Sequence, residues 1–235
     1  MQAVLAQPRG FCAGVTRAIH IVERALELHG TPVYVFHEIV HNPWVVDDLR
    51  LKGAVFVNDL ALVPGGSVLV FSAHGVSNAV VAQAEAMALH TIDATCPLVS
   101  KVHQQAQRFV RLGHTLLMIG HAGHEEVVGT MGQVDAPVHL VSRTADVQAL
   151  DLPSDTPVAY VTQTTLSIDD TAEIVAVDAV RSVFLDGQFP APDDRSADFG
   201  GARCLAGGLH VPAPGRSCRG DLGQRRPDRS PAAGL

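Results

Sequence analysis

Residues 14–36 read GVTRAIHIVERALELHGTPVYVF, and in them a helix pattern runs directly into a strand pattern. Apolar residues recur at helical spacing as far as Leu28, and Gly30 supplies a stop signal. Residues 33–36 form a short apolar run, as expected of a buried strand. A short apolar strand that alternates with helices predicts an α/β fold with parallel sheets.

The same alternation extends along the chain in both directions. Gly113 ends one helix pattern, and Ser77 can cap another. We predict strands at 3–6, 33–36, 54–57, 67–71, 91–94, 115–119, 138–141 and 158–161. We predict helices at 14–29, 43–52, 78–89, 98–112, after His124, at 144–150, and from Ser167 or Asp169 to about 184.

Composition and charge exclude several classes of function. The 235 residues are 47% hydrophobic, and the formal net charge of −7 argues against a nucleic-acid binder, which needs a basic face. The first residues carry no basic segment of a signal peptide, and no apolar run is long enough to predict a membrane span. We therefore expect a cytoplasmic protein. In that compartment the four cysteines are expected to be metal ligands, catalytic groups or buried thiols rather than disulfides.

Polar clusters follow several of the predicted strands. In parallel sheets the ligand crevice lies beyond the carboxyl ends of the strands, so these clusters are expected to share one site. They comprise Gly10–Cys12, His37–His41, Ser72–His74, Thr95-Cys96, Gly120–Glu126 and Thr162–Thr165.

Two of these clusters contain a cysteine at a strand-to-helix turn. Cys96 precedes Pro97, and proline is favoured in a first helical turn because its missing N–H costs nothing there. Thiols at helix N-termini favour the thiolate form, which binds soft metals and iron–sulfur clusters. Cys12 and Cys96 are therefore candidate metal ligands, and two unrelated buried thiols are the alternative.

The histidine turns suit an anion. His74, His121 and His124 lie beside glycines that allow close backbone approach, and the helix N-termini that follow offer free N–H groups to a phosphate or diphosphate. Thr162, Thr164 and Thr165 offer hydroxyl donors in the same setting.

One carboxylate in these turns is a candidate proton carrier. Glu126, two residues after His124, would have a raised pKa if it lay out of bulk water beside bound anions, and it could then carry a proton at neutral pH. The alternative is that Glu125 and Glu126 are first-turn acids that stabilise the helix dipole.

Residues 37–41 read HEIVH, which matches the H-E-x-x-H outline of zinc hydrolases. That motif needs a helix interior. Here it follows a predicted strand and runs into Asn42-Pro43, which disfavours a zinc hydrolase.

Six segments together resemble the 4-hydroxy-3-methylbut-2-enyl diphosphate reductase family, also called IspH/LytB, from residue 1 to about 184. They read PRGFCAGVTRAI, HEIVHNPWVVDDL, FSAHGVS, DATCPLVSKVH, IGHAGHEEVVGTMGQ and VTQTTLSIDDT. The resemblance implies an oxygen-sensitive enzyme of the non-mevalonate isoprenoid pathway. It implies that two electrons and protons remove the substrate's 4-hydroxyl as water, giving isopentenyl and dimethylallyl diphosphate.

The same resemblance implies roles for particular residues. Cys12 and Cys96 fall on two of three cysteine positions that hold a 4Fe–4S cluster, and Glu126 falls on the proton-relay position. The remaining positions bind the diphosphate or contact the substrate, and they fall on His41, His74, His124 and Thr164. Ferredoxin or flavodoxin is the implied electron donor.

The resemblance also implies the organisation of the chain. The family fold is a trefoil of three α/β units. The expected divisions are 1–96 for the first unit and 97–184 for the second, with the N-terminal strand joining a third unit. Residues 185–235 lose both periodicities and are dense in Pro, Gly, Ala and Arg, so we expect an irregular tail in place of the third unit. Truncation or a frameshift near residue 184 would explain it, and a flexible natural tail is the alternative.

Two departures from the family pattern follow. The family usually reads H-P-E-V where this chain has His124-Glu125-Glu126-Val127. The third cysteine ligand is not identifiable, because Cys204 and Cys218 lie in the wrong context. The alternative to an active reductase is therefore an inactive fragment that retains at most weak diphosphate binding.

Overall fold

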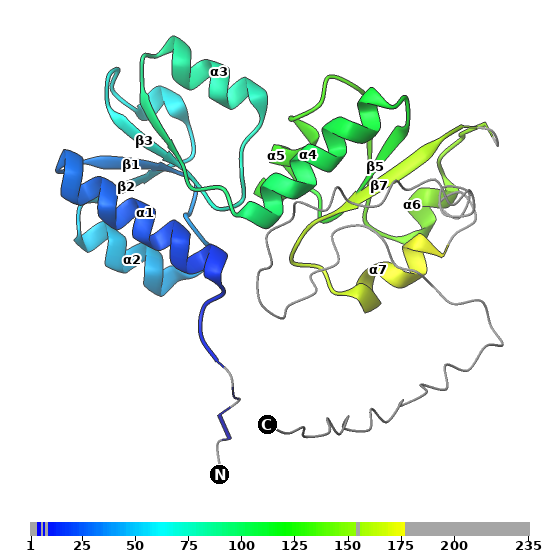
Figure 1. Ribbon diagram of the computed structural model, residues 1–235, viewed down its shortest axis with the longest axis horizontal. Coiled ribbons are helices and arrows are strands. Elements are labelled where there is room, and N and C mark those ends of the chain that lie inside the picture. Colours follow the sequence, from blue (N-terminus) through cyan, green and yellow to red (C-terminus); the bar gives the residue numbers. More distant parts are fainter. Residues whose placement is uncertain (1–3, 6, 8, 154–155, 177–235) are drawn as a thin grey trace, which may run out of the picture.

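The computed structural model describes residues 4–5, 7, 9–153 and 156–176 and contains two parallel β-sheets, each flanked by helices (Figure 1). The predicted α/β class with two parallel-sheet units is confirmed. The predicted tail at 185–235, and whatever replaces a third unit, lies outside the described residues. The division of the chain at residues 96 and 97 stays a prediction.

The first sheet has the strand order β2-β1-β3-β4, and every pair is parallel. Apolar residues of α1 and α2, such as Val22 and Leu49, pack on one face against Val35 and Val70. The other face is covered by α3 and a 3-10 turn, η1. The elements are β1 (Val33–Phe36), β2 (Ala54–Val57), β3 (Val68–Phe71), β4 (His90–Asp93), α1 (Ala13–His29), α2 (Pro43–Leu51), α3 (Asn78–Ala86) and η1 (Leu60–Leu62).

The second sheet has the order β6-β5-β7 and is also parallel. Its central strand is buried on both faces, with Leu116 and Met118 toward α4 and α5, and Leu117 and Ile119 toward α6 and α7. Two-sided burial explains the unbroken apolar run of this strand. The elements are β5 (Thr115–Ile119), β6 (Val138–Val141), β7 (Val158–Thr162), α4 (Pro97–Arg111), α5 (Glu125–Met131), α6 (Thr144–Gln148) and α7 (Ile168–Val175).

Helix α5 of the second unit docks on the loop that follows β3 in the first sheet. A Cβ atom added to Gly129 would lie 3.0 Å from the carbonyl oxygen of Gly75, so glycine permits this close approach. The Asn78 N–H donates to the carbonyl of Gly132 at 3.0 Å. The Gln133 side-chain amide donates to the carbonyl of Val76 at 2.6 Å. These contacts fix α5 beside the strand ends of the first sheet.

The predicted helices and strands agree with the structure to within a few residues, with one exception. The strand predicted at 3–6 is wrong at Val4 and Leu5, which lie outside any strand and are 89% and 69% exposed. Strands need a neighbour for their backbone hydrogen bonds, and no strand among the described residues pairs with this segment. The helix predicted at 78–89 ends earlier, at Ala86, because Ala88 adopts a positive φ of 54°. Helix α7 is described to Val175, and the rest of its predicted length lies beyond the described residues.

Candidate active site

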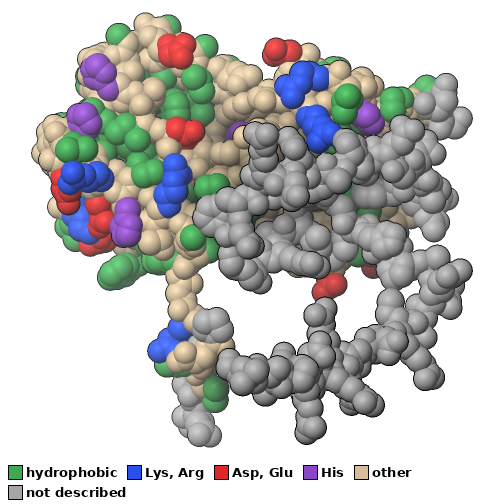
Figure 2. Space-filling model, in the orientation of Figure 1, with side chains coloured by type: hydrophobic (Ala, Val, Ile, Leu, Met, Phe, Trp, Pro, Cys, Tyr) green, Lys and Arg blue, Asp and Glu red, His purple; other side chains and the backbone are tan. Residues whose placement is uncertain are grey.

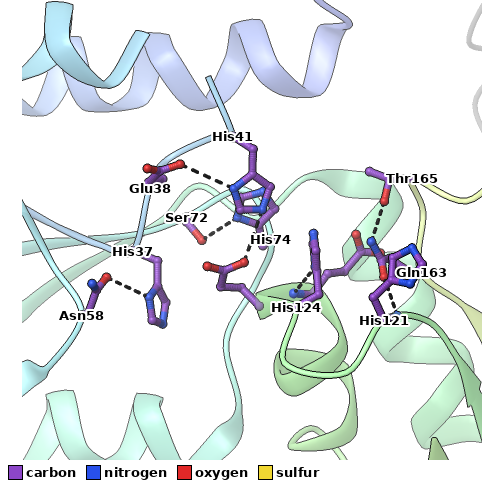
Figure 3. Close-up of polar contacts among 12 residues, drawn as sticks. His37, Glu38, His41, Asn58, Ser72, His74, His121, His124, Gln163 and Thr165 are labelled. Atoms are coloured by element: carbon purple, nitrogen blue, oxygen red, sulfur yellow. Dashed lines mark hydrogen bonds and ion pairs between the residues drawn. The ribbon is translucent and has the colours of Figure 1, made fainter. Parts of the chain in front are cut away.

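Three histidines from different turns meet at one point (Figure 3). His41 and His74 follow strands β1 and β3, and their rings stack with centroids 4.1 Å apart. His124 precedes α5, and its ring meets the other two edge-on at 5.1 Å and 5.7 Å. The docking of α5 on the first sheet thus assembles the predicted diphosphate-binding histidines into one cluster.

Burial sets the electrostatics of this cluster. It lowers the pKa of His74 to about 4, and the nearby charge of His41 acts in the same direction. Burial also lowers the pKa of His124, again with a contribution from His41. At neutral pH the two imidazoles are therefore uncharged, and each keeps one N–H to donate.

The tautomer of His124 follows from its capping bond. Its Nδ1 accepts the backbone N–H of Glu126 at 3.1 Å and caps α5. An accepting nitrogen carries no proton, so the proton of the neutral ring lies on Nε2. His124 therefore presents an N–H donor.

Two carboxylates contact the His41 ring, one at each of its two nitrogens. Glu38 Oε2 lies 3.5 Å from Nδ1, and Glu125 Oε2 lies 3.3 Å from Nε2. Burial acts to raise the pKa of Glu125, but its own backbone N–H and the nearby histidines hold that pKa below its ordinary value. Glu125 is therefore ionised at neutral pH.

Glu126 is buried, with 1% of its surface exposed, although it follows Glu125 directly. Its carboxyl accepts the backbone N–H of Thr164 at 2.6 Å and the Thr164 hydroxyl at 3.1 Å. Burial raises the pKa of Glu126, and the two bonds from Thr164 oppose that rise. A carboxyl in this environment can hold a proton and release it, as a proton relay requires.

Two buried polar residues of this region, Ser72 and Gln163, lie in the predicted polar clusters, but neither was predicted to have an individual role. Ser72 Oγ lies 3.4 Å from His74 Nδ1. Gln163 accepts the backbone N–H of His121 at 3.1 Å and donates to the Thr165 hydroxyl at 2.7 Å. Ser72 directly follows the strand predicted at 67–71, and Gln163 directly follows the observed end of β7, so a position just after a strand is the signal that could have singled them out.

The two predicted metal-ligand cysteines lie at helix N-termini, Cys12 before α1 and Cys96 before α4, and neither side chain makes a capping bond. A Cβ atom placed on Gly14 would lie 2.7 Å from Cys96 Sγ and 3.8 Å from Cys12 Sγ. The two thiols therefore lie near the same glycine, with Cys12 exposed and Cys96 half-buried. Thiols in this setting fit an iron–sulfur cluster, whose ligands are cysteine thiolates. Cys204 and Cys218 lie outside the described residues.

The close spacing of His41, His74 and Glu125 also resembles a metal triad, with ligand atoms within 4.8 Å of one another. The stacked rings argue against one shared ion. Imidazole nitrogens bind metals in the plane of the ring at about 2.0–2.1 Å, whereas these planes differ by 22° and their centroids lie 4.1 Å apart.

The zinc-hydrolase alternative fails on local structure. His37 and His41 lie in the loop between β1 and α2, not on a helix, and His37 has a positive φ of 61°. The ring of His37 contacts Asn58 Oδ1 at 3.2 Å instead. The two histidines therefore do not present the single helix face that H-E-x-x-H requires.

Acidic and basic side chains lie close together over α1 and α2 (Figure 2). Lys52 contacts Glu23 and Asp48 at 2.7 Å each, and Arg50 contacts Asp47 at 2.9 Å. Carboxylates thus neutralise these cations.

Among the described residues, no helix combines the length and apolar character needed to cross a membrane.

Together these features define a parallel α/β protein with a histidine-lined polar site beyond the carboxyl ends of its strands. Residues 3–187 match the family described as LytB protein, and the chain belongs to that family.

Similar proteins and solved structures agree with this assignment. The chain is 58% identical over 194 residues to 4-hydroxy-3-methylbut-2-enyl diphosphate reductase of Zymomonas mobilis, covering 83% of this chain and 56% of that protein. It is 60% identical over 190 residues to 4-hydroxy-3-methylbut-2-enyl diphosphate reductase 2 of Bradyrhizobium diazoefficiens, covering 81% of this chain and 61% of that protein. The chain thus spans 56–61% of the length of these relatives.

The fold is similar to that of the E-1-hydroxy-2-methyl-but-2-enyl-4-diphosphate reductase of Plasmodium falciparum. The TM-score is 0.72 at 44% identity, covering 76% of this chain and 55% of that chain. A second solved structure, of (E)-4-hydroxy-3-methyl-but-2-enyl diphosphate reductase, matches with a TM-score of 0.64 at 30% identity, covering 73% of this chain and 61% of that chain.

Proposed function

We propose that this chain acts as a 4-hydroxy-3-methylbut-2-enyl diphosphate reductase, an oxidoreductase of isoprenoid biosynthesis. In this reaction the C–O bond to the 4-hydroxyl breaks, two electrons and two protons are taken up, and water leaves. The products are isopentenyl and dimethylallyl diphosphate. The observation that carries the proposal is that His41, His74 and His124 converge at the turn that begins α5, where the next residue but one after His124, Glu126, has a buried carboxyl.

His41, His74 and His124 bind the diphosphate in this proposal. Imidazole N–H groups donate to phosphate oxygens, and the Nε2–H of His124 is free for this role because its Nδ1 is committed to the helix cap. Partial burial keeps water from competing for the donors. The substrate is thereby held at the carboxyl ends of the strands, where α/β proteins bind ligands.

Glu126 holds and delivers a proton in this proposal. Its raised pKa lets the buried carboxyl stay protonated nearer to neutral pH than an exposed glutamate. The Thr164 hydroxyl, 3.1 Å away, stabilises the carboxylate that remains after the proton leaves, and it is the candidate substrate contact. Since the backbone N–H of Glu126 is bonded to His124, the proton carrier and the anion site are positioned by the same turn.

Cys12 and Cys96 hold the iron–sulfur cofactor in this proposal. A 4Fe–4S cluster supplies the electrons and a Lewis-acidic iron for the leaving hydroxyl when it is bound. The proximity of both thiols to Gly14 supports this assignment. We propose ferredoxin or flavodoxin as the electron donor and the cytoplasm as the location, and no nucleic-acid or membrane partner.

The test is anaerobic reconstitution of the full chain with iron and sulfide, followed by an assay of substrate reduction with a chemical reductant. A stable 4Fe–4S absorption spectrum with turnover supports the proposal. Diphosphate binding without turnover would instead identify the inactive-fragment alternative. Binding of zinc with no uptake of iron would contradict the assignment of Cys12 and Cys96.

A further inference from the structure

The histidine cluster already contains a negative charge of its own. Glu125 Oε2 lies 3.3 Å from Nε2 of His41, and Glu125 and His74 offer ligand atoms within 4.8 Å of each other. The Glu125 side chain is 29% exposed, so water screens it only in part. A carboxylate therefore lies where an anion bound to the Nε2 side of His41 would lie.

We propose that Glu125 is a resident competitor of the diphosphate, which must displace this carboxylate from His41 before it can bind the three histidines. This inference rests on the proposed function, because it takes the histidine cluster as the diphosphate site. In this inference Glu125 sets the affinity of the site for the diphosphate, a role distinct from that of the neighbouring proton carrier Glu126.

Electrostatics gives the direction of the effect. Two like charges a few ångströms apart near a protein surface repel by an amount equivalent to more than a tenfold change in binding. Partial exposure of Glu125 and movement of its side chain on displacement reduce this penalty. Removal of the charge is therefore expected to tighten the binding of pyrophosphate about tenfold.

Local structure allows two independent variants. Glu125→Gln keeps the shape of the side chain and removes its charge. Glu125→Pro removes the carboxylate entirely, and proline is favoured at the first position of a helix, which Glu125 occupies in α5. The backbone N–H that proline removes is paired with the carboxylate of Glu125 itself, so no other group loses its partner.

Glu38 provides a matched control. It contacts the same ring as Glu125 but through Nδ1, at 3.5 Å, and its side chain is 47% exposed against 29% for Glu125. Glu38→Gln removes an equal charge from His41 on the more hydrated side. Its effect on pyrophosphate binding is expected to stay within about twofold, because an exposed charge is largely screened.

The experiment is calorimetric titration of the full-length protein and the three variants with pyrophosphate in metal-free buffer. Tighter binding by both Glu125 variants, with little change for Glu38→Gln, supports the inference. Wild-type binding that is equal to or tighter than that of Glu125→Gln overturns the inference and leaves the diphosphate site intact. If no protein binds pyrophosphate, both the inference and the assignment of the histidines to diphosphate fail.

Discussion

The Nε2 atom of His41 lies 3.3 Å from a carboxylate oxygen of Glu125, although the two residues follow strands of different sheets. His41 lies in the loop after β1, and Glu125 is the first residue of α5, which follows β5. The contact exists because α5 docks through Gly129 on the loop that contains His74. The polar site is therefore a product of how the two units pack.

Glu126→Gln is expected to lower the turnover of the reconstituted protein by about 10²–10⁴-fold, because the amide cannot deliver a proton. Glutamine has the same shape and can still accept the 2.6 Å bond from the Thr164 N–H, so the fold should persist. Pyrophosphate affinity should change little, since this side chain points toward Thr164. Rates with a chemical reductant and calorimetry measure the two effects.

The control for this variant is Glu85→Gln, which changes an exposed carboxylate on α3. It should leave turnover unchanged. Equal rates for Glu126→Gln and wild type would rule out Glu126 as the proton carrier.

His74 should make the protein less stable in acid. Its pKa is about 4 in the folded state, below the ordinary value of 6.5, because burial disfavours the charged ring. Between these two values the unfolded chain binds more protons than the folded one, so stability rises with pH and is lost as the pH falls from 6.5 toward 4. His74→Gln removes this contribution, and its unfolding free energy should fall less steeply over that window.

Urea denaturation at several pH values measures the difference between the two proteins. Comparison with wild type isolates His74, because Glu126, whose pKa is raised, contributes a pH dependence of the opposite sign in both proteins. His29→Gln, at an exposed position on α1, is the control. If the unfolding free energies of His74→Gln and wild type change in parallel with pH, this pH dependence does not come from His74.

Gly14→Ala is expected to abolish iron loading, because the new methyl group would lie 2.7 Å from Cys96 Sγ. Alanine is a good helix former and Gly14 lies within α1, so loss of loading should occur without loss of helix. Iron and acid-labile sulfide per chain after reconstitution, together with circular dichroism, measure this outcome. In Gly65→Ala the added methyl would meet the carbonyl of Met87 at 3.4 Å, far from the cysteines, and this variant should load like wild type.

Gly129→Ala should destabilise the protein even though alanine is the better helix former by about 1 kcal/mol. The added Cβ would lie 3.0 Å from the carbonyl oxygen of Gly75, and overpacking of this kind costs about 1–3 kcal/mol. A net loss near 1 kcal/mol corresponds to a fall in Tm of about 2–4 °C in a chain of this size.

Thermal unfolding tests this variant against Val128→Ala, which changes the exposed neighbour on the same helix. Pyrophosphate affinity should also fall in Gly129→Ala, since His124 would be displaced from His41 and His74. A higher Tm in Gly129→Ala would show that helix propensity outweighs the close approach.

The sequence predicts the α/β class and the bounds of most elements because their signals are local. Gly30 ends α1, Ser77 caps α3, and the apolar run of β5 reflects burial on both faces. The strand predicted at residues 3–6 fails because strand formation depends on a neighbouring strand, which a local apolar pattern cannot reveal.

The candidate site shows the same division between local and long-range information. Motifs in the sequence point to His41, His74, His124 and Glu126. These four residues lie in the polar segments that follow strands. The contact of Glu125 with His41 could not be predicted, because first-turn acids are common and this one gains its partner through the docking of two units. The opposite environments of Glu125 and Glu126 likewise follow from three-dimensional packing.

The edge-on ring of His124 offers a label-free way to follow the arrangement of the two units. His41 and His74 belong to the first unit, whereas His124 caps a helix that packs on the second sheet. Aromatic rings shift the magnetic resonance of protons near them, so the imidazole protons of His124 would report the separation of the units directly. An NMR spectrum of three histidine side chains could thus track undocking of α5 before any loss of secondary structure.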